Sequence, residues 1–136
     1  MASTERVLAA DGASAAQLHL EEFVSANASV KLAVLTSGDG MEIAAHPKRH
    51  VGLTQRMAAM SSSLQALATA LAKESGLGNN RSVIIESEGG AILVLGVPSP
   101  GLSASLSVVA ANGASLGHLL WACRSCCAAL EKTLRR

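Results

Sequence analysis

The residues best suited to chemistry lie near the C-terminal end of the chain, where three cysteines fall within five positions. Cys123 and Cys126 form a C-x-x-C pair, Cys127 follows directly, and His118 precedes them. A structural zinc needs four donors, usually two such pairs, and the sequence has no second pair. A redox pair belongs at a helix N-terminus, where the dipole lowers a thiol pKa, but these cysteines fall in the middle of an expected helix. We therefore expect buried structural thiols.

An alternative stays open for the same cluster. A small thiol- or metal-dependent sensor or enzyme would use Cys123, Cys126 and His118 as its reactive or ligating groups. Bound zinc, or a thiol with a lowered pKa, would favour that alternative.

Other signatures of catalysis are missing from the sequence. It contains no G-x-x-x-x-G-K-[ST], no G-x-G-x-x-G between strand and helix, and no G-x-S-x-G elbow. Four acidic residues fall at hairpin ends, where exposed turn carboxylates are the usual case: Asp39, Glu42, Glu86 and Glu88. A short loop carries four basic or titratable residues: His46, Lys48, Arg49 and His50. We predict no catalytic residue, no cofactor and no bound metal.

The composition excludes some classes of partner. At 136 residues the chain is expected to form one domain with a sizeable core. The net charge is +1, and the aromatic residues are limited to Phe23 and Trp121, which argues against nucleic-acid binding. Only 15% of residues are charged, too few to cover a monomer evenly, so we expect a surface for a partner or for self-association.

The sequence also indicates where the protein resides. Its apolar runs are too short to span a bilayer, and the N-terminus lacks the basic and apolar regions of a signal peptide. Three clustered cysteines fit a reducing compartment better than a disulfide framework. We expect a cytoplasmic protein without membrane insertion.

A long amphipathic helix, residues 53–76, is the element around which the rest is arranged. Its large apolar residues recur at intervals of three and four: Leu53, Met57, Met60, Leu64, Leu67 and Leu71. We expect this apolar stripe to cover the sheet and Gly76 to end the helix in a left-handed cap. The opposite face is small and nearly uncharged, and we expect it to be a dimer or partner interface: Ala58, Ala59, Ser62, Gln65, Ala66 and Thr69.

Turn signals, including the glycine turn at residues 37–40, and two-residue alternation predict the remaining elements, with Ser115 as the expected cap of the last helix. The expected order is helix, two strands, helix, three strands, helix, with short turns making both strand groups antiparallel. Residues 91–97 are apolar on both faces and should be an interior strand. We assign residues 1–13 to a flexible arm and 14–136 to one α+β domain. Trp121 lies away from the last helix's leucine stripe, and we expect it to pack on the first helix or to anchor a partner.

Three segments in this order resemble the Roadblock (dynein light-chain) family: SGDGMEIAA at 37–45, SVIIESEGGAILVLGV at 82–97 and ANGASLGHLL at 111–120. The resemblance covers about residues 14 to 134. It implies a five-stranded antiparallel sheet with the long helix on one face and the first and last helices on the other. It further implies a homodimer with paired long helices and sheets joined edge to edge. Such dimers are non-catalytic platforms that bind or regulate Ras-like GTPases, and the bacterial gliding-motility polarity protein is a relative of this type.

Overall fold

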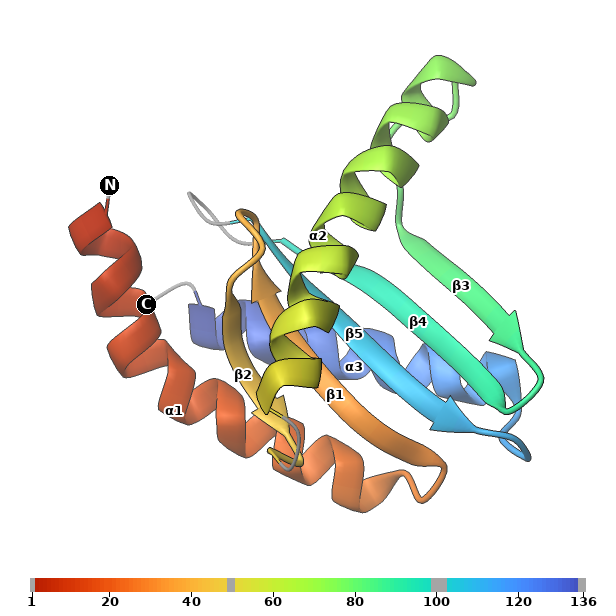
Figure 1. Ribbon diagram of the computed structural model, residues 1–136, viewed down its shortest axis with the longest axis horizontal. Helices are drawn as coiled ribbons and strands as arrows, with labels where there is room; N and C mark the ends of the chain where they lie inside the picture. The colour runs from red at the N-terminus through yellow and green to blue at the C-terminus, as the bar shows by residue number, and fades with distance from the viewer. Residues whose placement is uncertain (1, 49–50, 99–102, 135–136) are drawn as a thin grey trace.

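The computed structural model describes residues 2–48, 51–98 and 103–134. Along the chain it forms three helices and five strands (Figure 1): α1 (Ala2–Ala26), β1 (Val30–Ser37), β2 (Glu42–His46), α2 (Val51–Glu74), β3 (Ser82–Ser87), β4 (Gly90–Val97), β5 (Ala104–Ala111) and α3 (Leu116–Leu134). The predicted order of elements and the α+β class are confirmed.

The strands form one antiparallel sheet in the order β2-β1-β5-β4-β3. The hairpins β1–β2 and β3–β4 are local, and the pairing of β1 with β5 joins the two halves. Helix α2 crosses one face of this sheet, while α1 and α3 lie on the other (Figure 1). This is the arrangement that the family resemblance implies.

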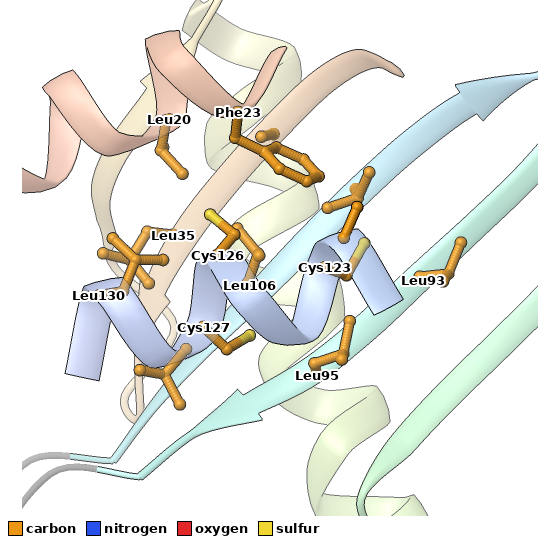
Figure 2. Packing of buried hydrophobic residues seen from close by; sticks show 14 of the residues in the cluster. Leu20, Phe23, Leu35, Leu93, Leu95, Leu106, Cys123, Cys126, Cys127 and Leu130 are labelled. Atoms are coloured by element: carbon orange, nitrogen blue, oxygen red, sulfur yellow. The ribbon is translucent and has the colours of Figure 1, made fainter. Parts of the chain in front are cut away.

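The main core lies between the sheet and the pair α1 and α3. It joins Leu20 and Phe23 of α1, Leu106 of β5, and Leu130 and the cysteines of α3 (Figure 2). A smaller cluster lies under α2, where Val34 and Ala45 of the sheet meet Ala58. The larger apolar layer therefore belongs to the face that α1 and α3 cover, and α2 rests on a thinner one.

Strand β4 is an interior strand, as its sequence predicts. It pairs with β3 on one side and β5 on the other, and Leu93, Val94 and Leu95 are buried. Burial from both faces explains why this run is continuously apolar rather than alternating.

Two predicted helix signals are confirmed in detail. Gly76 has a φ of +75°, its N–H bonds to the carbonyl of Lys73, and Leu77 N–H reaches Ala72 O, which is the Schellman arrangement that ends α2. At the start of α3, His118 N–H donates to Ser115 Oγ at 3.3 Å, so Ser115 is the N-cap.

The first helix is longer than the sequence predicts. It begins at Ala2 rather than near Ser14, and so includes the residues 2–13 that were expected to form an arm. Gly12 is buried, and a Cβ atom there would lie 3.7 Å from Leu134 Cδ2, so α1 passes close to the end of α3 at this point.

The two edges of the sheet differ. At the β2 edge, Gln17 of α1 donates from Nε2 to Ala45 O at 2.7 Å and accepts the Ala45 N–H at 3.3 Å. This side chain occupies the N–H and C=O of Ala45, two of the backbone groups that another strand would need. At the other edge, Ile84 and Ile85 of β3 are 38% and 37% exposed. The β3 edge is the one that remains open to pairing.

Candidate functional site

Helix α2 places its small side chains, not its large ones, against the sheet. Thr54, Ala58 and Ser61 are buried. Ser107 of β5 donates a hydrogen bond of 2.6 Å to Ser61, and Ser62 donates one of 3.0 Å to the carbonyl of Gly38. The sheet surface beneath the helix is itself partly hydroxylic, so small polar residues fit it and allow a close approach.

The predicted orientation of α2 is therefore wrong. Four large residues of the expected sheet-covering face are exposed instead, and we call them the apolar stripe: Leu53 at 38%, Met60 at 61%, Leu67 at 69% and Leu71 at 70%. Met57 and Leu64 of the same set are half-buried. The spacing predicts the helix correctly. The hydrogen bonds of Ser61 and Ser62, together with the packing of Ala58, hold the small face of the helix against the sheet.

The six predicted interface residues are divided by this orientation. Ala58 is 0% exposed and packs on Val34 and Ala45 of its own sheet, so it offers no surface to a partner. Ser62, Gln65 and Thr69 are half-buried toward the sheet, whereas Ala59 and Ala66 are exposed. Gln65 also accepts a hydrogen bond of 3.1 Å from Asn80.

The sheet carries a second apolar area on the face that α2 crosses. The register places Val83, Ile85 and Ile92 on this side, because Val83 pairs with Val94 and Ile85 pairs with Ile92. Ile85 is 37% exposed, and Val83 and Ile92 are half-buried. Helix α2 lies mainly over β1 and β5 and leaves β3 and most of β4, the β3–β4 area, without a helix on this face of the sheet (Figure 1).

The cysteines face the core. Figure 2 shows the three thiols close to Leu106, Leu95 and Phe23. Burial raises the pKa of each thiol from an ordinary value near 9.0 to about 12, and neighbouring thiols add to the effect at Cys123 and Cys127. A thiol with so high a pKa is a poor nucleophile near neutral pH. The burial expected for these cysteines is confirmed.

His118 does not join the cysteines. It is exposed on the outer side of α3 and stacks on Trp121, with ring centroids 6.0 Å apart. Among the residues that the structure describes, no group of three or more His, Cys, Asp or Glu side chains is placed to hold a metal ion. The structure therefore keeps His118 apart from the cysteines, with which it would have to combine in a metal or redox site.

The remaining titratable candidates lie apart from one another. Asp39 accepts a hydrogen bond from Ser37 inside the β1–β2 turn. Glu86 and Glu88 are exposed beside the β3–β4 turn, and Glu42 is half-buried at the start of β2. In the basic loop, His46 and Lys48 are described, whereas Arg49 and His50 lie outside the described residues.

Trp121 corrects another expectation. It does not pack into the α1–α3 contact but is 66% exposed. Its neighbours on the helix, Ala122 and Cys123, are the ones that enter the core. The expected packing on the first helix is therefore wrong, and the role of Trp121 as an anchor for a partner stays a prediction.

No helix of the described chain is both long enough and apolar enough to cross a membrane.

Comparison with solved structures supports the fold. The Roadblock/LC7 domain from Streptomyces avermitilis matches with a TM-score of 0.80 at 21% identity, over 88% of this chain and 98% of that one. Myxococcus xanthus MglB matches with 0.77 at 18% identity, over 88% and 87%. The gliding protein MglB from Thermus thermophilus matches with 0.76 at 22% identity, over 90% of each chain. No curated protein sequence matches the chain significantly.

The family model of the Roadblock/LC7 domain matches residues 16–99, which is more than half of the chain and includes α2, the β1–β2 hairpin and the β3–β4 hairpin. With the strand order and the distribution of helices over the two faces, this match establishes that the chain belongs to the Roadblock/LC7 domain family.

Proposed function

We propose that this protein is a non-catalytic homodimeric scaffold that binds a Ras-like small GTPase and regulates or localises it in the cytoplasm. The observation that carries the dimer is the apolar stripe of α2 beside the uncovered β3–β4 area on the same face of the sheet. A monomer in water gains nothing by exposing so much contiguous apolar surface, whereas a partner that covers it does.

A second copy of the same chain fits this surface. Around a two-fold axis near β3, the apolar stripe of one protomer would lie on the β3–β4 area or the stripe of the other. The β3 edges would meet at the same axis, which supplies hydrogen-bond partners for both edge strands. The Gln17 contact at β2 directs such pairing to β3, because the β2 edge is already occupied.

The proposed interface thus moves within α2 from the small face toward the apolar stripe. Ala59 and Ala66 stay exposed but lie outside the apolar stripe, while Ala58 belongs to the protomer's own core. Burying the stripe would contribute roughly 25 cal/mol for each Å² removed from water, before the costs of association are subtracted.

The GTPase partner is proposed from the family and from the kind of surface available. The resemblance to the family implies a regulatory or adaptor domain, and the structural neighbours include MglB proteins, one of them described as a gliding protein. A platform of this type acts through surfaces that join two protomers, so a dimer would be required for the GTPase to bind.

The dimer is tested by two matched double variants. Leu67→Glu with Leu71→Glu places charges in the apolar stripe, and Ala66→Glu with Ala70→Glu places the same charges on neighbouring exposed positions of the same helix. Light scattering at matched concentrations should show a dimer for the wild type and a monomer for the leucine pair. The alanine pair should remain a dimer. A monomeric wild type, or a leucine variant that still dimerises, would contradict the proposed interface.

The partner is tested separately with purified Ras-like GTPases of the native host, each loaded with GDP or a non-hydrolysable GTP analogue. Wild type should form a complex with one of them on gel filtration, and the monomeric leucine variant should lose it. A measurement of GTP hydrolysis in the complex then separates a protein that accelerates the reaction from one that only localises the GTPase. If the dimer forms but no host GTPase of this class binds, the scaffold is retained and the GTPase assignment fails.

A further inference from the structure

The outer face of α3 combines an anchor-sized aromatic residue with positive charge. We define this outer face as the exposed residues of the helix from its third position onward: His118, Trp121, Arg124, Ser125, Ala128 and Lys132. Trp121 is the only tryptophan of the chain, and two thirds of its surface is in contact with solvent. Large aromatic residues usually bury most of their area, and tryptophan is enriched among the residues that dominate binding energy in interfaces.

The indole of Trp121 is exposed but is stacked against a neighbouring ring. Its ring and that of His118 are stacked at an interplanar angle of 29°, one helical turn apart. A tryptophan already ordered by a neighbour loses less conformational freedom when a partner covers it. The stacked pair therefore presents a flat apolar platform that is suited to receive a side chain from outside.

The two exposed charged residues of the outer face are both basic. Arg124 and Lys132 are exposed, and neither makes a hydrogen bond or ion pair with another described residue. The one acidic residue of α3, Glu131, is half-buried at the side of the helix. Arg124 also lines a hollow of about 630 Å³ between α3 and the ends of β4 and α2, together with Arg81 and Glu131.

We propose that the outer face of α3 is a docking surface for an acidic, amphipathic segment of a partner protein, with an apolar side chain seated on Trp121 and carboxylates paired with Arg124 and Lys132. The hollow beside Arg124 gives room for a carboxylate, because its lining carries two arginines against the single carboxylate of Glu131. Charge of opposite sign would speed the encounter and set the orientation, and the indole would supply most of the affinity.

A lipid surface is a weaker match for the same residues. Recognition of anionic headgroups usually requires a cluster of four to eight basic residues, and within the described part of α3 the outer face has only Arg124 and Lys132 as fixed positive charges. The net charge of +1 does not supply the rest. We therefore commit to a protein segment and treat membrane binding as a result that would overturn the proposal.

Trp121 and Lys132 lie away from the proposed dimer interface, whereas the hollow beside Arg124 is also lined by Gln65 and Thr69 of α2. Helix α3 and helix α2 lie on opposite faces of the sheet (Figure 1), so the outer face of α3 would stay open in a dimer joined through α2 and β3. The proposal does not depend on the GTPase or on dimerisation, and it should hold in the monomeric leucine variant described above.

The probe is a random peptide library displayed on phage, selected on the full chain after depletion on the Trp121→Ser variant. The enriched peptides should be rich in Asp and Glu and should contain a large apolar residue. Because Trp121 is the only tryptophan, a change in its emission on adding a synthetic selected peptide reports contact at this residue. Trp121→Ser should weaken binding by roughly thirty-fold or more, as expected for a residue that dominates an interface.

A matched pair of charge reversals tests the electrostatic part. Arg124→Glu should weaken the peptide and reduce the salt dependence of its binding, whereas Arg56→Glu, at an exposed arginine of α2 on the other face, should leave both unchanged. Thermal unfolding of each variant checks that the fold is retained.

The proposal fails if no Trp121-dependent peptide is enriched, if the enriched peptides are basic or uncharged, or if Arg124→Glu has no effect. It also fails if Trp121 emission responds to phosphatidylserine vesicles but not to the selected peptides.

Discussion

The hydroxyl of Ser107 in β5 donates a hydrogen bond of 2.6 Å to the hydroxyl of Ser61 in α2, and both residues are buried between helix and sheet. This contact joins two residues 46 positions apart in the chain. It requires the serine side of α2 to face inward, and the helical geometry then turns Met60, Leu67 and Leu71 outward.

The Ser61–Ser107 pair should be energetically coupled. Ser61→Ala leaves the buried hydroxyl of Ser107 without its acceptor and should lower the free energy of unfolding by about 1–3 kcal/mol. The double variant Ser61→Ala with Ser107→Ala removes both groups and should cost less than the sum of the single changes. Chemical denaturation of the four proteins measures the coupling, with the exposed Ser63→Ala as a control that should change little.

We expect that no buried position of β4 tolerates a charged side chain. Leu93 is 0% exposed, so Leu93→Asp would bury an unpaired carboxylate and should unfold or insolubilise the protein. The matched control is Ile84→Asp, at the residue opposite Leu93 in the β3–β4 register, which is 38% exposed and should remain folded. Soluble expression and thermal unfolding report the outcome, and a Leu93→Asp variant of unchanged stability would contradict the packing described for β4.

The thiols should contribute packing rather than chemistry. Cys123→Ala and Cys127→Ala should each lower the free energy of unfolding by about 1–3 kcal/mol through lost contacts. Neither should abolish partner binding in a variant that still folds. Binding that is lost while stability is fully retained would point to a functional role for the cluster instead.

The same thiols should make stability sensitive to alkaline pH. Burial raises their pKa to about 12, above the ordinary 9.0, so the folded state holds these protons more tightly than the unfolded state does. Their contribution is complete below pH 9 and should be lost as the pH rises from about 9 toward 12. Denaturation series above and below pH 9 should show this decline in the wild type and a smaller one in a variant with all three cysteines replaced by alanine.

Gln17 should protect the β2 edge. Gln17→Ala removes both of its hydrogen bonds to Ala45 and should speed hydrogen exchange of the Ala45 amide while lowering the unfolding free energy by about 1 kcal/mol. Gln17→Glu keeps an acceptor for the Ala45 N–H but has no donor for its carbonyl, so its amide should exchange at an intermediate rate. Equal exchange in all three proteins would show that the edge is protected by other contacts.

The sequence alone was sufficient for features set by neighbouring residues. The glycine turn at residues 37–40, the cap at Gly76, the N-cap at Ser115 and the continuous apolar run of β4 all depend on local backbone preferences or on one strand's own pattern. Because these signals lie within a few positions of the elements they define, the order of elements and the α+β class followed from them, and the family resemblance indicated how the elements assemble.

Which side of α2 faces the sheet was decided only by the tertiary structure. A helix with one large apolar side and one small side can bury either, since periodicity gives the angle between the two sides and not the direction of the sheet. The choice depends on Ser107 and Val34, which come from strands far away in the chain. The same reason applies to Trp121: its position on the helix was readable, but its exposure depends on where α1 packs, and that is a property of the assembled fold.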